Sequence, residues 1–235
     1  MRLRFQGAYR TRQAAVAAVP SNLTVGYDNK NVVALNFELM CELAPWDYPV
    51  IYWLNRLLPD ARQLLDAGGH MGTKYRAFYP YLDLTAVNWT IYDVPAVAEA
   101  GRLRANEDGL NNLVFTASLD EQNTPDIFLA SGLLQYLDIP FSGLLTQLPS
   151  LPEHLLLNKV ALHDAEPVFT LENFGTGLVP YQIRNREAFL SELETLGYRI
   201  QDQWHIPALT HAIPTHPEIG HFCNQGFYLI LEKQG

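Results

Sequence analysis

A short apolar segment that runs directly into a cluster of glycines, residues 63–72, constrains the fold of this chain more than any other feature. Its sequence is QLLDAGGHMG. Glycine has no Cβ, so a turn of this kind can adopt positive φ and bring backbone amides close to a ligand. The dinucleotide fingerprint Gly-x-Gly-x-x-Gly does not fit, because His70 takes the third position of that frame counted from Gly68. The segment predicts a β-strand ending at Asp66 and a ligand-binding turn after it.

The composition is typical of a globular protein and argues against several partners. The chain has 235 residues, of which 48% are apolar, enough for one sizeable α/β domain with an accessory segment. A net charge of −9 without any basic run disfavours nucleic acid, because phosphate binding needs a basic footprint. No apolar run of ~20 residues is present, so we expect no membrane span. Cys41 and Cys223 form no CxxC motif, and we predict a cytoplasmic protein.

Residues 1–60 precede the first clear strand and are predicted to form a helical cap. Helical spacing of apolar residues extends over 12–19, 31–43 and 46–58. The predicted division is therefore a cap at residues 1–60 and a ligand-binding domain at residues 61–235. The aromatic residues Trp46, Tyr48 and Trp53 would serve either the core or a homodimer contact.

From residue 63 onward, strand and helix patterns alternate along the chain. Such alternation is typical of a parallel sheet with helices on both faces. The strand patterns cover residues 64–67, 88–92, 113–116, 126–131, 155–160, 198–204 and 227–232. The predicted fold is an α/β, Rossmann-like, mostly parallel sheet of seven strands, with the last two joined as a hairpin.

Polar residues and glycines follow the first four predicted strands, where an open parallel sheet binds its ligand. Asp66 would orient the glycine turn or cap the next helix. Asp93 ends the second strand, and its two oxygens would accept from both hydroxyls of a ribose or cap the helix that begins at Pro95. The candidate ligand contacts are Asp66, Ala67, Gly68, Gly69 and Gly72; Asp93 and Val94; Ser118 and Leu119; and Ser131 and Gly132.

Four ordered segments, LLDAGGHMGTKY, WTIYDVPAVAEAG, LVFTASLDE and PDIFLASGLLQYL, resemble class I S-adenosylmethionine (SAM) dependent methyltransferases. In particular, they are similar to a poorly characterised bacterial family associated with surface-polysaccharide gene clusters. The resemblance covers residues 60–160 and, more loosely, the opening segment. It implies the seven-stranded methyltransferase fold, SAM as methyl donor, and cofactor contacts at Asp66, Gly68, Gly69, Gly72 and Asp93. It supplies no acceptor, and NKVALHDAEP after the fifth strand departs from the family's Asp-Arg pattern.

The acceptor site must be predicted from chemistry. Methyl transfer requires alignment and, for a hydroxyl or ammonium acceptor, removal of a proton. His163 and Asp164 follow the fifth strand on the expected ligand side and are candidate catalytic residues; the alternative is a polar loop. The segment between the last two predicted strands contains four histidines: His205, His211, His216 and His221. It is interpreted as a substrate-contacting lid, a metal site or a surface loop. Their spacing matches no standard zinc motif, so no metal is predicted, and His211 is retained as a catalytic candidate.

The function predicted from these patterns is SAM-dependent methyl transfer to an oxygen or nitrogen of a small-molecule or sugar-like acceptor. One rival is a SAM-binding protein that does not transfer the methyl group. Another is a nucleotide-dependent oxidoreductase or sugar-nucleotide enzyme on a related fold. The interrupted glycine fingerprint and the lack of a Tyr-x-x-x-Lys pair after the fourth strand disfavour the second rival.

Overall fold

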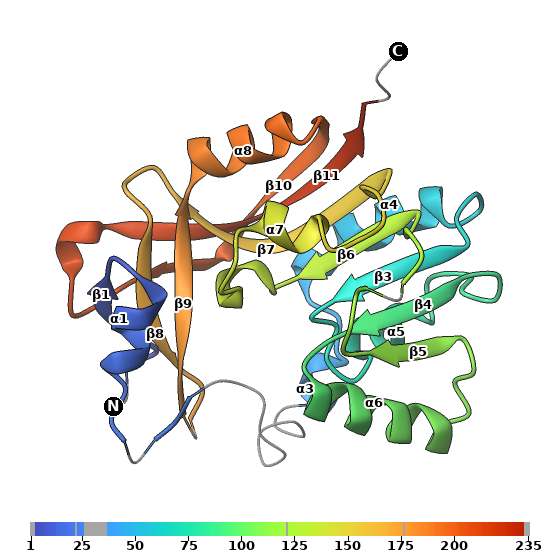
Figure 1. Ribbon diagram of the computed structural model, residues 1–235, viewed down its shortest axis with the longest axis horizontal. Helices are drawn as coiled ribbons and strands as arrows, with labels where there is room; N and C mark the ends of the chain where they lie inside the picture. Colours follow the sequence, from blue (N-terminus) through green and yellow to red (C-terminus); the bar gives the residue numbers. More distant parts are fainter. Residues whose placement is uncertain (1–2, 22, 26–36, 121, 176, 233–235) are drawn as a thin grey trace.

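The computed structural model describes residues 3–21, 23–25, 37–120, 122–175 and 177–232. Within these residues the strands join into one mixed, eleven-stranded sheet. Figure 1 shows two regions of this sheet, with parallel strands and helices to the right and a mostly antiparallel region to the left. The glycine turn lies at the carboxyl edge of the parallel region.

Five parallel strands form the centre of the fold, in the order β5-β4-β3-β6-β7. They are β3 (Gln63–Ala67), β4 (Asn88–Tyr92), β5 (Leu113–Thr116), β6 (Ile127–Ser131) and β7 (His154–His163). The strand β11 (His221–Leu231) pairs antiparallel with β7, and β10 (Tyr198–Ala212) pairs antiparallel with β11. The predicted α/β class, the mostly parallel central sheet and the final hairpin are confirmed.

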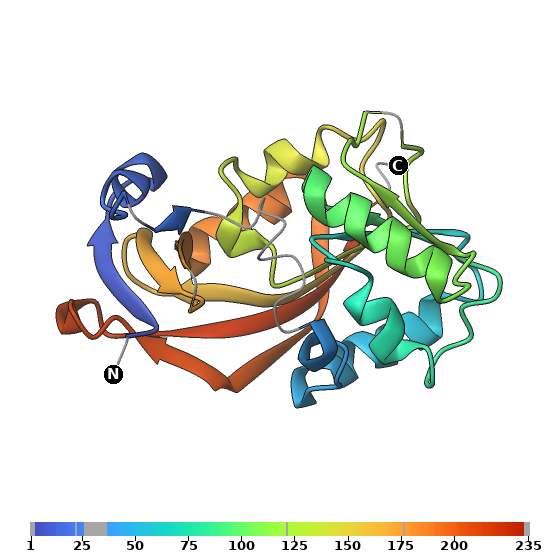
Figure 2. The same cartoon turned by 90° about the horizontal axis from the view of Figure 1, so that it is seen from below.

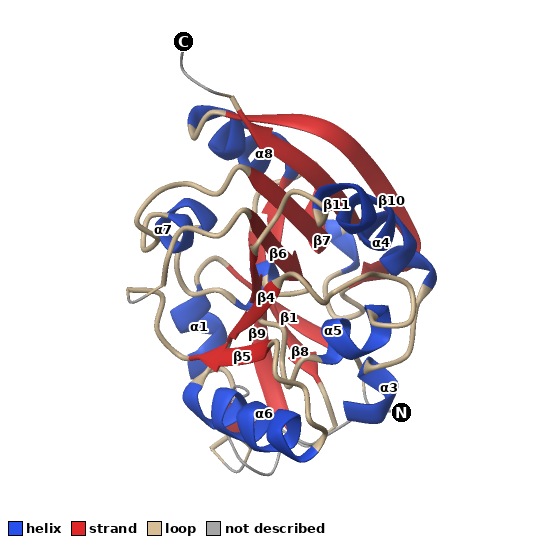
Figure 3. Cartoon of the chain, turned by 90° about the vertical axis from the view of Figure 1, so that its right-hand side faces the viewer, coloured by secondary structure: helices blue, strands red, loops and turns tan. Residues whose placement is uncertain are grey.

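Apolar side chains cover both faces of the central sheet, as expected where helices pack on each side. Leu64 and Leu65 are adjacent in β3 and enter two different core clusters, because successive residues of a strand point to opposite faces. One face carries α4 (Tyr48–Leu57), α5 (Thr73–Phe78) and α6 (Pro95–Glu107). The other carries α7 (Phe141–Leu145) and α8 (Arg186–Thr195). Figure 3 shows α4 and α5 on the side opposite α7 and α8.

The predicted count of seven strands is wrong, because four further strands join the sheet. A hairpin of β8 (Val168–Asn173) and β9 (Gly177–Asn185) is inserted between β7 and α8. β9 continues along the edge of β7 where β6 has ended, pairing Leu162 with Arg184. The strand β1 (Phe5–Tyr9) pairs with β8, and β2 (Thr24–Val25) pairs with β9.

The predicted helical cap is not confirmed as a unit. β1 belongs to the sheet, and α1 (Arg12–Ala17) lies beside it. Figures 1 and 2 place β1 and α1 at the opposite end of the molecule from α4. The helices expected at 12–19 and 46–58 are present as α1 and α4. Of the helix expected at 31–43, residues 31–36 lie outside the described residues, Phe37–Met40 form α3, and the helix ends before residues 41–43. The boundary at residue 60 stays a prediction.

Candidate functional site

The turn after β3 has the backbone conformation that its glycines allow. Gly68 and Gly72 have φ of 71° and 77°, and His70 between them also has a positive φ, 55°. The Gly68 amide donates to the Tyr92 carbonyl at 2.8 Å, which joins the turn to the end of β4. Gly69 meets a different constraint, since a Cβ there would lie 2.5 Å from Oδ2 of Asp66. A side chain at residue 69 would therefore displace the carboxyl group beneath the turn.

Asp66 is buried under this turn, with 1% of its surface exposed. Trp89 Nε1 donates to its Oδ2 at 3.2 Å. Burial raises the pKa of Asp66 to about 7, opposed by the Trp89 hydrogen bond and the charge of Lys74. The next residue, Ala67, is fully buried in the core, so only its backbone is available to a ligand.

Asp93, at the end of β4, holds the turn from the other side. Its Oδ2 accepts from the His70 amide at 2.9 Å, and its Oδ1 accepts from the Val94 amide at 2.8 Å. In the predicted contact, a ribose hydroxyl would share this carboxylate with the two backbone amides. The N-cap of α6 is Val94, which has no side-chain capping bond, so the alternative role of Asp93 as the helix cap is not confirmed.

The candidate ligand contacts after β5 and at the end of β6 form hydrogen bonds with different parts of the chain. Ser118 Oγ accepts from the Asp120 amide at 3.3 Å, and Leu119 is buried with 2% exposure. Ser131 Oγ accepts from Asn158 Nδ2 at 3.3 Å. Gly132 has φ of 88°, and its amide donates to the Asn158 carbonyl at 2.8 Å. β6 and β7 are thus joined at the point where β6 ends.

A cavity of about 210 Å³ opens beside the glycine turn. It brings together Asp66, Gly68, Gly69 and Ser131, four of the candidates predicted from the sequence. Its lining also includes Leu39, Met40, Glu42, Ala44, Trp46, Thr73, Lys74 and Lys159. The candidates outside its lining are Ala67, Gly72, Asp93, Val94, Ser118, Leu119 and Gly132.

Two lysines in this cavity lining were not predicted from the sequence. Lys74 Nζ forms an ion pair with Oδ2 of Asp47 at 2.8 Å, and Asp47 is completely buried. Asp47 belongs to η1 (Pro45–Asp47), and the amide of the preceding residue Ala44 also donates to Oδ2 at 3.1 Å. Lys159 lies in β7 with φ of 59°. The one clue to them in the sequence is that lysine is rare in this chain. Only four lysines occur, and two of them line this cavity.

The structure does not bring the three predicted catalytic residues into this cavity. His163 ends β7 and is 5% exposed. Burial lowers its pKa against the opposing effects of the Glu166 backbone and Asp164, so the neutral imidazole is favoured. Asp164 has a largely exposed carboxylate, which accepts from Arg186 Nε at 2.9 Å. The adjacent positions of His163 and Asp164 thus do not produce a hydrogen-bonded pair of side chains.

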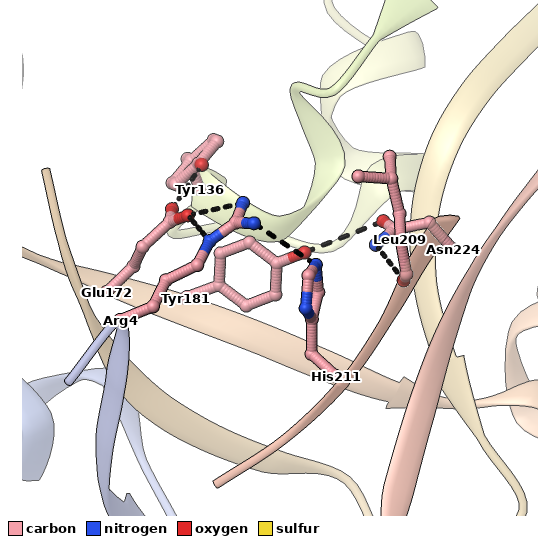
Figure 4. Close-up of polar contacts among 7 residues, drawn as sticks. All are labelled: Arg4, Tyr136, Glu172, Tyr181, Leu209, His211 and Asn224. Atoms are coloured by element: carbon pink, nitrogen blue, oxygen red, sulfur yellow. Dashed lines mark hydrogen bonds and ion pairs between the residues drawn. The ribbon is translucent and has the colours of Figure 1, made fainter. Parts of the chain in front are cut away.

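His211 lies in a polar network drawn in Figure 4. Arg4 Nη1 and His211 Nε2 lie 3.2 Å apart, and Arg4 Nη2 donates to Glu172 Oε1 at 3.0 Å. Tyr136, in η2 (Leu134–Tyr136), donates its hydroxyl to Glu172 Oε2 at 2.6 Å. Burial and then Arg4 lower the pKa of His211 to about 4. At neutral pH its Nε2 accepts from Arg4, so the network joins the residue before β1 to β8, β10 and η2.

The expected histidine-rich loop is mostly strand. β10 and β11 extend further than predicted, so His205 and His211 lie in β10 and His221 begins β11. His216 precedes the short helix η3 (Pro217–Ile219) in the connection. In the part of the chain that the structure describes, no three His, Cys, Asp or Glu side chains are grouped to hold a metal ion. Within the same residues, no helix is long and apolar enough to span a bilayer.

Solved structures share this fold at low sequence identity. An O-methyltransferase of a trans-AT polyketide synthase from Brevibacillus brevis, solved with S-adenosylhomocysteine (SAH), is 13% identical over 79% of this chain and 71% of that chain, with TM-score 0.59. The N-terminal domain of EvdMO1, solved in the presence of SAH and D-fucose, is 12% identical over 91% and 100%, with TM-score 0.56. The glycopeptide N-methyltransferase MtfA, solved with SAM, is 15% identical over 82% and 97%, with TM-score 0.52.

No family model and no curated protein matches the sequence. The structural comparisons nevertheless define the class of the fold. The central strands, the antiparallel β11 and the flanking helices form an α/β fold that matches the class I methyltransferases. The fold implied by the resemblance, apart from its count of seven strands, is thereby confirmed.

Proposed function

We propose that this protein is a SAM-dependent methyltransferase that acts on an oxygen or nitrogen of a small-molecule or sugar-like acceptor. The observation that carries the proposal is the buried Asp66 carboxyl group beneath a glycine turn, at the carboxyl edge of β3 and beside the 210 Å³ cavity. A buried carboxyl group destabilises the folded protein when it ionises without a cation. The ammonium group of SAM would supply that cation.

The residues that would hold SAM come from the four strand ends. Asp66 would face the ammonium group, the turn would offer amides to the methionine portion, and Asp93 would accept from the ribose hydroxyls. Residues at the ends of β5 and β6 would surround the adenine ring and the methionine side. The proposed set is Asp66, Ala67, Gly68, Gly69, Gly72, Asp93, Val94, Ser118, Leu119, Ser131 and Gly132. When bound, SAM supplies an electrophilic methyl group on a sulfonium.

The structural neighbours support a small acceptor. Their names include mitomycin 7-O-methyltransferase and a methyltransferase of 1,6-didemethyltoxoflavin, and one was solved in the presence of D-fucose. The charge of −9 supports an acceptor other than nucleic acid. We retain as proposals a catalytic role for His163, Asp164 or His211. A link to surface polysaccharides, a cytoplasmic location and a homodimer are also proposals.

Methyl transfer from labelled SAM tests the function. The purified chain is incubated with methyl-labelled SAM and a panel of phenols, amines, sugars and hydroxylated heterocycles, and products are detected by mass spectrometry. We expect at least one labelled product with stoichiometric SAH. Asp93→Ala should reduce its formation, whereas Asp83→Asn, at an exposed residue in a loop before β4, should not. SAM binding without any product would favour the non-catalytic binding protein.

A further inference from the structure

We propose that the Lys159 amine accepts the proton of an acceptor hydroxyl group during methyl transfer, and that this hydroxyl belongs to an aromatic or enolic molecule placed against Trp46. The proposal rests on the proposed methyltransferase function. It assigns the acceptor chemistry to a residue of β7 instead of to the histidines.

The backbone of Lys159 is held in an unusual conformation. Its φ of 59° is left-handed, which is uncommon for a residue other than glycine, asparagine or aspartate. It immediately follows Asn158, the last residue of β7 that pairs with β6, and it precedes the pairing of Leu162 with β9. Such conformations persist where the surrounding structure enforces them and are concentrated at functional sites. The register between β7 and β11 shifts at this point, and the Lys159 side chain lines the cavity.

A missing side chain at Gly132 makes room for the lysine. A Cβ on Gly132 would lie 3.0 Å from Lys159 Cε and 3.1 Å from its Nζ. The amine therefore lies close above the chain that follows β6, next to Ser131 in the cavity lining. This is where the methyl donor and the acceptor would meet, because the ends of β3 and β6 border the same cavity.

Four charged groups act on Lys159 from the surrounding elements: Lys74 of α5, Asp47 of η1, Asp66 of β3 and Glu172 of β8. Lys74 is already paired with Asp47, whereas Lys159 forms no hydrogen bond or ion pair among the described residues. Burial, followed by Lys74, lowers the pKa of Lys159 to about 8 against the three carboxylates. A cationic sulfonium in the same cavity would lower the pKa further, because like charges disfavour the ammonium form.

The proton transfer balances without any further reactant. The acceptor O–H bond breaks, and its proton is taken by the lone pair on Lys159 Nζ. The acceptor oxygen forms a bond to the methyl carbon while the carbon–sulfur bond breaks. The electron pair of the broken bond stays on sulfur, which becomes a neutral thioether. The resulting ammonium group then releases its proton to solvent. A base of this strength matches an acidic hydroxyl such as a phenol, whose pKa is about 10, better than an alkanol.

The walls of the cavity fit the same class of acceptor. Trp46 is half-buried, lines the cavity, and is fixed through its carbonyl, which accepts from Asn158 Nδ2 at 3.2 Å. Leu39 and Met40, both exposed, add apolar surface to the lining. An indole ring beside apolar side chains favours a flat aromatic molecule.

Competitive acetylation of the whole protein tests the state of Lys159 without an acceptor. Trace acetic anhydride is applied between pH 6 and pH 11, with and without saturating SAM, and the modified lysines are quantified by peptide mass spectrometry. We expect half-maximal reactivity of Lys159 near pH 8 and a further change with SAM. Lys74 should react much less, because its amine is paired with the buried Asp47. An ordinary lysine profile, or a profile that SAM leaves unchanged, would overturn the proposal. Calorimetric SAM binding in the same samples separates this failure from failure of the proposed function.

Lys159→Met tests the catalytic step. With phenolic acceptors we expect kcat to fall about 10²- to 10⁴-fold, as loss of a general base does, while the KM for SAM changes less than about threefold. The acidic limb set by Lys159, along which activity rises with pH as the amine loses its proton, should also disappear from the pH profile. A variant that binds SAM, retains the native circular dichroism spectrum and keeps wild-type kcat would refute the proposal, as would activity on amines alone.

Discussion

Replacement of Asp66 by asparagine should make the protein more stable at neutral and alkaline pH while weakening its binding of SAM. The side chain is 1% exposed, and burial is the largest cause of its raised pKa. An asparagine side chain at this position would have nearly the same shape and an oxygen to accept from Trp89 Nε1, but it would not ionise. The substitution therefore removes the charge while keeping the local packing.

The magnitude follows from the difference between the folded and unfolded pKa. The pKa of Asp66 rises from 3.8 to about 7. At about 1.4 kcal/mol for each pKa unit, this corresponds to about 4 kcal/mol. Because the folded pKa is the higher one, the contribution to stability is full below about pH 4 and is lost as the pH rises to about 7. Asp66→Asn should match the wild type near pH 4 and exceed it by up to about 4 kcal/mol at pH 8.

Urea unfolding at half-unit intervals from pH 4 to pH 8 measures this difference. Asp83→Asn is a suitable control, because Asp83 is exposed and its hydrogen bonds to Thr85 lower its pKa, giving a pH dependence of opposite sign. Calorimetry at pH 8 should show weaker SAM binding by Asp66→Asn despite its greater stability. A constant difference between variant and wild type across the pH range would refute the reasoning.

Two further substitutions test the geometry around the cavity. Gly69→Ala should lower the free energy of unfolding in urea by about 1–3 kcal/mol and reduce SAM binding, because its methyl group would overlap Asp66. Gly143→Ala is the control and should fold normally, since the nearest atom to its Cβ would lie at 3.8 Å. Lys74→Met should lower stability by about 3–5 kcal/mol by leaving the Asp47 charge buried and unpaired. Adding Asp47→Asn should restore most of that loss in thermal melts; no recovery would contradict the ion-pair explanation.

The parts of the fold that could be predicted are those in which local patterns and tertiary structure agree. Apolar strands followed by helices predicted β3 to β7, and the Asp66 to Gly72 motif correctly indicated the turn. The β8–β9 hairpin was missed because its pairing depends on partners distant in sequence, including β1, whose Phe5 pairs with Glu172. The N-terminal strand could not be predicted from its own residues, since its stability comes from that edge.

The difference between local patterns and contacts between distant segments also explains which residues of the candidate site could be predicted. Glycines and acids at strand ends are visible in the sequence because one segment contains both the strand and its turn. Lys74, Asp47 and Lys159 come from three separate elements and approach only through packing. The histidines attracted attention by their density, but His211 accepts from Arg4 and His163 is buried away from the cavity lining. Density in sequence did not predict proximity in the fold.

Calorimetric titration of the purified chain with SAM, SAH and NAD tests the central claim most directly. We predict micromolar binding of both adenosyl ligands and none of NAD, with a clear loss of SAM affinity in Asp93→Ala, whose carboxylate otherwise binds the His70 amide of the turn. Absence of SAM and SAH binding by the folded wild type, or a preference for NAD, would contradict the account.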